Sequence, residues 1–186
     1  MSNRSHRTFL LAIVATAGAA ILPAAANAQT HASGGSAYYP GPKHAYVHNG
    51  KAVAPRNAPK AVRDLIKAAN KIVTKPYRLG GGHGRWNDSA YDCSGSVSYA
   101  LHGAHLLDSP EDSSGLMGWG KGGTGKWITV YANGGHAFLV VAGLRFDTGW
   151  RDSYGQSHGD APGSGPRWGK PRPTDGFVSR HPGGVK

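Results

Sequence analysis

With 186 residues, the chain has room for one domain of ordinary size around a hydrophobic core. It carries 21 Lys and Arg against 10 Asp and Glu, so it is strongly basic. No zinc-finger spacing, RNP-like aromatic motif or basic helical stripe accompanies this charge, which argues against a nucleic-acid-binding protein.

The first 28 residues have the features of a secretory signal peptide. Arg4 and Arg7 give a basic start, residues 9–22 form an apolar run, and residues 26–28 (ANA) form a small-x-small cleavage site. The apolar run is shorter than the roughly 20 residues that cross a bilayer. We therefore expect export and cleavage before Gln29, leaving 19 basic and 10 acidic residues, a net charge of +9 and no membrane span.

Residues 29–57 are rich in Gly, Ser and Pro and show no sustained apolar period, which predicts a flexible leader outside the core. From residue 58 onward we expect one domain, which begins with a helix capped by Asn57 with Pro59 in its first turn. Its apolar face has residues at three- and four-residue steps: Ala61, Val62, Leu65, Ile66, Ala69, Ile72 and Val73.

Pro76 ends that helix, and the glycines of residues 79–84 predict a loop. A second apolar pattern from Val97 to Leu107 predicts a helix that begins close to Cys93. Residues 108–126 are predicted to be a surface connection. Strands are expected at 127–131, 136–141 and 144–148 as an antiparallel meander, followed by a loop over 149–174 and a short strand near 176–180.

Cys93 is the single cysteine, in a chain predicted to be exported, so it cannot form an internal disulfide. One interpretation is a small buried hydrophobic residue, and the other is a reactive thiol. A helix N-terminus lowers a thiol pKa through its unpaired N–H groups and its dipole. The small residues 94–96 would also let a substrate backbone approach the sulfur.

A thiol nucleophile needs a general base, and nine histidines remain after residue 28. His102 and His105 lie too late in the cysteine's own helix, roughly 13 Å or more along its axis, and five others lie in polar stretches. His136 opens an apolar strand after a glycine turn and is the favoured base. His83, in the glycine-rich loop, is the alternative.

Asp147 is the candidate to orient His136, because it lies 11 residues further on, near the end of the next strand of a hairpin. The alternative interpretation is a strand-terminal aspartate that starts the turn 147–149.

Three segments resemble the NlpC family of cell-wall cysteine peptidases, a branch of the papain-like superfamily: residues 75–81 (KPYRLGG), 91–97 (YDCSGSV) and 135–141 (GHAFLVV). The resemblance covers about residues 58–180. Leu79 stands where the family usually has tryptophan, and Gly135 where many members have serine. The chain therefore resembles a divergent member of the family.

The resemblance implies a papain-like α+β fold, with N-terminal helices packed on a central antiparallel sheet and the nucleophile at a helix N-terminus. It implies Cys93 as nucleophile, with its backbone N–H helping to bind the oxyanion, His136 as base and Asp147 as the orienting group. Tyr77, Asp92 and Ser94 match positions that form the pocket for the amino end of the stem peptide. The mechanism requires no metal and no cofactor.

From the resemblance we expect a secreted or periplasmic, wall-associated peptidoglycan endopeptidase that cleaves stem-peptide amides, at the bond between γ-D-glutamate and the diamino acid. Anionic wall polymers are expected as further partners because of the charge, and the protein is expected to be a monomer. Two alternatives remain open. One is a wall amidase or secreted antibacterial toxin with the same Cys93 and His136, and the other is a non-catalytic wall-binding module.

Overall fold

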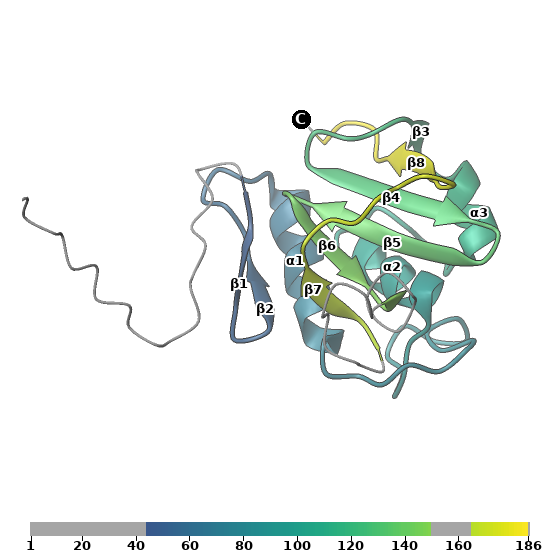
Figure 1. Ribbon diagram of the computed structural model, residues 1–186. Helices are drawn as coiled ribbons and strands as arrows, with labels where there is room; N and C mark the ends of the chain where they lie inside the picture. The colour runs from purple at the N-terminus through teal and green to yellow at the C-terminus, as the bar shows by residue number, and fades with distance from the viewer. Residues whose placement is uncertain (1–43, 150–164, 186) are drawn as a thin grey trace, which may run out of the picture. The chain divides into compact units, whose positions relative to one another are not determined.

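The computed structural model describes residues 44–149 and 165–185. Its helices in these ranges are α1 (Lys60–Ile72), α2 (Cys93–His102) and α3 (Ser113–Gly118), and β1 (Tyr46–His48) and β2 (Lys51–Val53) form a hairpin. The remaining strands are β3 (Lys121–Gly122), β4 (Ile128–Asn133), β5 (His136–Val141), β6 (Leu144–Asp147), β7 (Arg167–Gly169) and β8 (Val178–His181). These six form one antiparallel sheet in the order β3-β8-β4-β5-β6-β7 (Figure 1).

The helices pack on this sheet and on one another. α2 contacts β5 and β6, α3 contacts β4 and β8, and α1 packs against α2. The strands β4, β5 and β6 follow one another as a meander, as the sequence predicts. The α+β class, with helices packed on a central antiparallel sheet, is confirmed.

The predicted amphipathic helix is α1, and its buried face is apolar: Val62, Leu65, Ile66, Ala68, Ala69 and Ile72. The predicted cap is wrong, because Pro59 occupies the N-cap position with no side-chain cap. The carbonyl of Pro59 accepts hydrogen bonds from the N–H groups of Val62 and Arg63. The helix therefore begins just after the proline, whose ring is pre-set for a helix start.

Residues 44–57 were expected to pack on no core, and this prediction is wrong. Asn49 and Gly50 both have positive φ, 48° and 74°, as a tight hairpin turn between β1 and β2 requires. Ala45 and Ala52 are buried in the hydrophobic core, and Ala45 N–H donates to the Ala142 carbonyl. The Asn-Gly pair was the signal for this hairpin, but small buried alanines leave no apolar period.

A side chain of α1 holds this hairpin to the rest of the domain. Asn70 Oδ1 accepts from Ala52 N–H at 2.9 Å, and Asn70 Nδ2 donates to the Ala52 carbonyl at 2.8 Å. The same Oδ1 accepts from Trp168 Nε1 of β7 at 2.9 Å. One amide thus links a hairpin, a helix and an edge strand that are distant in sequence.

Two stretches predicted to be loop contain regular structure. Residues 108–126 include α3, whose Leu116 is fully buried, and the short strand β3. In the predicted loop 149–174, β7 pairs with β6, and Trp168 packs on Phe146 with ring centroids 4.8 Å apart. Both elements are short and surrounded by Gly, Ser and Pro, so local composition conceals them.

The predicted signal peptide, residues 1–28, lies outside the described residues, and so do residues 29–43 of the predicted leader. Among residues 44–149 and 165–185, no helix has the length and apolar character needed to cross a bilayer.

Replacing Asn70 by Leu should destabilise the domain. The change leaves the buried Ala52 backbone groups and the Trp168 indole N–H without their partner. At about 1 kcal/mol for each hydrogen bond, the free energy of unfolding should fall by about 2–4 kcal/mol. Urea denaturation measures this change. The exposed neighbour Lys71 provides the control, because Lys71→Leu should stay within about 0.5 kcal/mol of wild type. Equal unfolding of the two variants would contradict the role of Asn70.

Candidate active site

Cys93 is the first residue of α2, as predicted, and it is partly exposed. Asp92 caps the helix, and its Oδ1 accepts from Gly95 N–H at 2.8 Å. Its Oδ2 accepts from Gly80 N–H at 2.8 Å, which ties the glycine-rich loop to the helix start. The cysteine therefore sits at a helix N-terminus fixed from two sides.

Gly95 allows that loop to approach. A Cβ at position 95 would lie 2.0 Å from the Gly81 carbonyl oxygen, so no larger residue fits without moving the loop. Asp92 N–H donates to the same Gly81 carbonyl at 3.1 Å. The small residue was predicted to admit a substrate backbone, and here it admits the protein's own backbone.

His136 is the first residue of β5 and is brought to Cys93 by the turn before it. Asn133 Oδ1 accepts from the N–H groups of Gly135 at 3.0 Å and His136 at 2.9 Å, which closes the turn. The His136 ring and the backbone N–H of Ala137 both lower the pKa of the Cys93 thiol, so both lie close to the sulfur. A strand end thus presents both an imidazole and an amide to the sulfur.

Asp147, the last residue of β6, completes the row. It is fully buried, and its Oδ1 lies 2.8 Å from His136 Nε2 and accepts from Gly149 N–H at 2.8 Å. Since Nε2 is turned to Asp147, Nδ1 is the ring nitrogen that remains available to Cys93. The structure therefore brings Cys93, His136 and Asp147 together.

The environment of Asp147 includes residues that the sequence analysis missed. Arg145 Nη1 and Arg172 Nη1 lie 3.6 Å and 3.9 Å from Asp147 Oδ2. A Cβ at Gly149 would lie 3.0 Å from both His136 Nε2 and Asp147 Oδ2, so glycine keeps this space open. Arg145 had a signal, because it lies two residues before Asp147 and alternate residues of a strand share a face.

The electrostatics favour a charged pair of sulfur and imidazole. Burial raises the pKa of Cys93, but the hydrogen bond and charge of His136 and the N–H of Ala137 bring the pKa below the usual 9.0. Burial lowers the pKa of His136, but hydrogen bonds to Asp147 and Cys93 and their charges raise it to about 10. A thiolate beside an imidazolium is the nucleophilic form of such a pair.

His83, the alternative base, contacts other groups. Its Nε2 lies 3.0 Å from Asp92 Oδ1 and 3.2 Å from Ser94 Oγ, and it is absent from the groups that shift the pKa of Cys93. Asp92 and Ser94 are buried on either side of Cys93 in the sequence. Tyr77 is half-buried and pairs through its backbone with Tyr91.

The arrangement can perform nucleophilic attack on a carbonyl carbon. It supplies a partly exposed sulfur at a helix start, an imidazole that can move a proton, and a buried carboxylate that fixes the imidazole. The residues within 44–149 and 165–185 include no group of three or more His, Cys, Asp or Glu placed to hold a metal ion.

Comparisons with known proteins give fold similarity only. No protein-family model matches the chain, and no curated protein matches it. Similar solved structures include the peptidoglycan hydrolase RipB from Mycobacterium tuberculosis, with 21% identity, 69% of this chain and 68% of that chain covered, and a TM-score of 0.47. A hypothetical invasion protein of Mycobacterium tuberculosis has 18% identity, 74% and 71% coverage and a TM-score of 0.46. The P60 domain of an antigen from M. avium subspecies paratuberculosis has 18% identity, 64% and 93% coverage and a TM-score of 0.42. These neighbours are NlpC/P60 proteins, the family that the sequence motifs resemble.

Proposed function

We propose that this protein is a peptidoglycan hydrolase that uses Cys93 as nucleophile, His136 as general acid and base, and Asp147 as the group that orients His136. The observation that carries the proposal is the position of the His136 ring, which lies 2.8 Å from the buried Asp147 carboxylate and close enough to the Cys93 sulfur to lower its pKa. Such a relay on a helix-start cysteine is the machinery of acyl transfer.

In the proposed reaction, the Cys93 thiolate attacks the carbonyl carbon of an amide. The backbone N–H of Cys93, at the start of α2, would help to stabilise the oxyanion of the tetrahedral intermediate. The His136 imidazolium gives its proton to the departing amine, and a thioester remains on Cys93. His136 then takes a proton from water, the resulting hydroxide attacks the thioester, and the thiolate and a carboxylic acid are released.

The proposed substrate is the peptidoglycan stem peptide, cut between γ-D-glutamate and the diamino acid, and this choice follows from the motif resemblance. Tyr77, Asp92 and Ser94 are proposed to bind the amino end. Asp92 already accepts from two backbone N–H groups and contacts His83, so it would act on an ammonium chiefly through its charge. Ser94 and His83 supply the neighbouring polar atoms.

Export through the predicted signal peptide, location in the wall or periplasm and a monomeric state belong to the same proposal. A wall amidase or a secreted antibacterial toxin would use the same Cys93 and His136 on another amide. Mass spectrometry of digested muropeptides distinguishes these by the bond that is cut.

Replacing Cys93 by Ala should abolish cleavage of purified muropeptides, because no other thiol exists in the chain. The domain should stay folded, since Cys93 is only partly buried and lies outside the hydrophobic core. Liquid chromatography with mass spectrometry measures cleavage, and circular dichroism checks the fold. Retained cleavage by the folded variant would refute the assignment.

The pH dependence of alkylation tests the charged pair. Because the pKa of Cys93 is lowered, iodoacetamide should react with it faster than with a free thiol at pH 6 to 7. His136→Ala removes the imidazole that lowers the pKa of Cys93 and leaves only the Ala137 N–H against burial and Asp92, which raise it, so the midpoint of the rate should move to higher pH. His83→Ala is the control and should leave the midpoint in place. Wild-type reactivity equal to that of a free thiol would favour the non-catalytic wall-binding module.

The loss of kcat on replacing Asp147 should depend on whether the new side chain can still accept a hydrogen bond from His136. Asp147→Asn keeps an oxygen that can accept from His136 Nε2–H, whereas Asp147→Ala keeps none, so kcat should fall more in the alanine variant, by about 100-fold or more. Both variants remove the carboxylate that pairs with the buried Arg145, so both should have a lower melting temperature than wild type. Kinetics well below each melting temperature separate the two effects. Equal kcat for Ala and wild type would remove Asp147 from the mechanism.

A further inference from the structure

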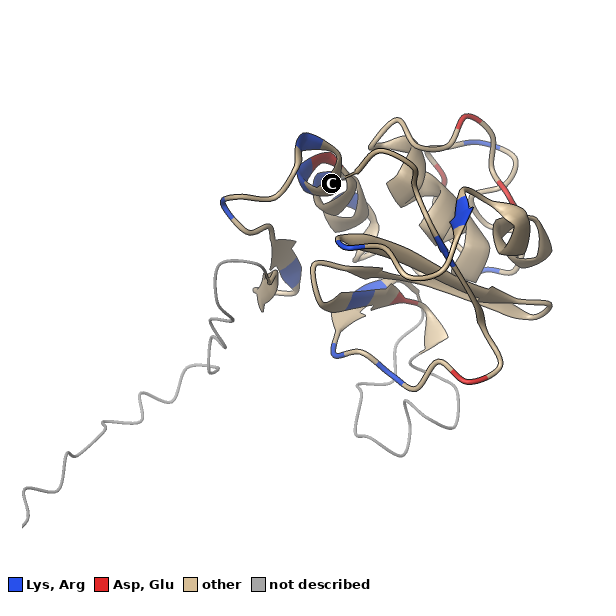
Figure 2. Ribbon diagram, turned by 90° about the horizontal axis from the view of Figure 1, so that it is seen from above, with Lys and Arg blue, Asp and Glu red and all other residues tan. Residues whose placement is uncertain are grey.

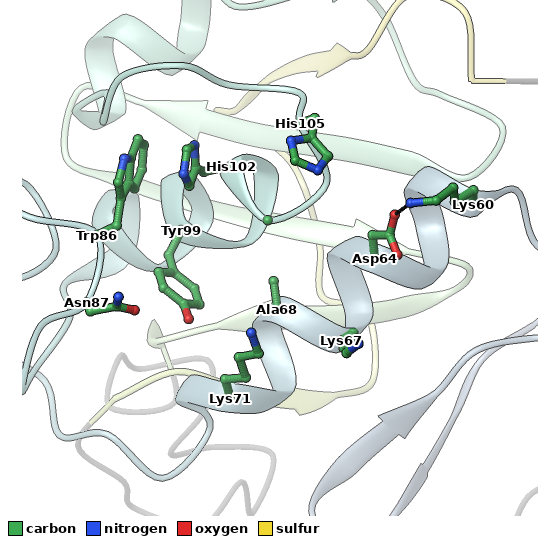
Figure 3. Close-up of a pocket in the computed structure, with 11 residues that line it drawn as sticks. Lys60, Asp64, Lys67, Ala68, Lys71, Trp86, Asn87, Tyr99, His102 and His105 are labelled. Carbon is green, nitrogen blue, oxygen red and sulfur yellow. Dashed lines mark hydrogen bonds and ion pairs between the residues drawn. The ribbon is translucent and has the colours of Figure 1, made fainter.

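A groove on the domain lies away from the three catalytic residues, between α1 and α2. One hollow of this groove, which we call the first hollow, has a volume of about 400 Å³ (Figure 3). An adjoining hollow of about 530 Å³ shares Lys71, Asn87 and Tyr99 with it. We call the two together the α1 groove. Neither Cys93, His136 nor Asp147 lines it.

The first hollow is lined at its base by Ala68 of α1 and by Gly103 at the end of α2. A Cβ at Gly103 would lie 2.3 Å from the Cβ of Ala68, so only glycine permits this approach. Because Ala68 and Gly103 are small, the longer side chains on either side of them form the walls of the groove. The groove is therefore a consequence of tight helix packing, with one charged wall and one aromatic wall.

The charged wall belongs to α1, which carries Lys60, Arg63, Lys67 and Lys71 against one acid, Asp64 (Figure 2). No basic helical stripe was predicted from the sequence, and this prediction is wrong for α1. Lys60, Lys67 and Lys71 all line the hollow, at spacings of seven and four residues that share a helix face. They extend over roughly 16 Å of helix axis.

Most of this charge is not neutralised by the fold. Lys60 pairs with Asp64, but Lys67 and Lys71 are exposed and make no ion pair among the described residues. Like charges four residues apart destabilise a helix by about 0.2–0.5 kcal/mol. In the adjoining hollow Lys75 adds charge, while Arg85 and Arg78 both pair with Asp88, at 3.6 Å and 2.9 Å.

The opposite wall is aromatic. Trp86 stacks on His102 with ring centroids 3.8 Å apart and planes 4° apart, and Figure 3 shows the two rings side by side. His102 Nδ1 lies 3.0 Å from the Leu107 carbonyl, which fixes the ring. Tyr99 and the amide of Asn87 lie next to them. A flat aromatic face and an amide suit the apolar face and the hydroxyls of a sugar ring.

We propose that the α1 groove binds a linear, phosphate-bearing glycan of the cell envelope. The spread of lysines fits several phosphates along one chain better than a single phosphate ion. The aromatic wall offers one stack, whereas single-stranded nucleic acid is bound on successive aromatic platforms. The proposal takes its location in the envelope from the proposed function, but binding does not depend on catalysis.

Binding should be measured by calorimetry with the Cys93→Ala chain and a glycerol phosphate hexamer that carries glucose substituents. Lys67→Glu with Lys71→Glu should weaken binding at least about tenfold and lower the salt slope of log Kd by about two. Lys126→Glu with Lys170→Glu, two exposed lysines outside the groove, changes the net charge equally and should have a much smaller effect. Trp86→Ala should weaken binding of the glucosylated hexamer and leave binding of the unsubstituted hexamer unchanged.

Equal losses from the two lysine pairs would overturn the proposal, because binding would then follow net charge alone. Tighter binding of a hexanucleotide or of phosphatidylglycerol vesicles than of the glucosylated hexamer would also overturn it, in favour of nucleic acid or a lipid surface. With active protein, Lys67→Glu and Lys71→Glu should leave cleavage of small soluble muropeptides unchanged. A chain that binds the hexamer in the groove but cleaves nothing would refute the hydrolase and keep this site.

Discussion

The buried carboxylate of Asp147 is the constraint on which the rest of the site depends. A carboxylate with no exposed surface is unfavourable by several kcal/mol unless hydrogen bonds and positive charge surround it. Here His136, the Gly149 N–H and the guanidinium groups of Arg145 and Arg172 surround it. These contacts stabilise the buried carboxylate and fix its position. Because the carboxylate is fixed, it also fixes the orientation of the His136 ring.

The register of the hairpin explains how two residues 11 apart meet. β5 and β6 pair with Leu139 opposite Phe146, and continuing this register places Asp147 opposite Phe138. His136 lies two residues before Phe138 and therefore on the same face, diagonal to Asp147. Diagonal partners lie about 7–8 Å apart at the backbone, within reach of an imidazole. A shift of one residue would turn His136 and Asp147 to opposite faces.

The elements with strong periodic patterns were predictable from the sequence, and those with small or polar contacts were not. α1, α2 and the meander follow from apolar spacing, and Cys93 with His136 follows from what a thiol nucleophile needs. The hairpin at 46–53 is attached through the side-chain amide of Asn70, a contact that no apolar pattern records. Arg145 is 1% exposed although a charged residue in a strand is usually expected to face solvent.

The contact of His83 with Asp92, and the α1 groove, could not be predicted because both join residues whose proximity arises only from the fold. His83 reaches the helix cap because Gly81 and Gly95 let the loop touch α2. The groove exists because Gly103 meets Ala68 across two helices. In each case a glycine lets two backbone segments come into contact, and this contact brings polar side chains near one another.

The helix start alone does not make Cys93 a nucleophile. Asp92 caps α2 and so organises the N–H groups around the sulfur, but its negative charge raises the pKa of Cys93, as burial also does. The cap and the dipole therefore oppose each other at this position. His136 has to supply the larger effect, and it can do so only while Asp147 keeps it protonated. The pKa of Cys93 is thus lowered by a residue on another element, and in the proposed mechanism the helix contributes its position and its amides.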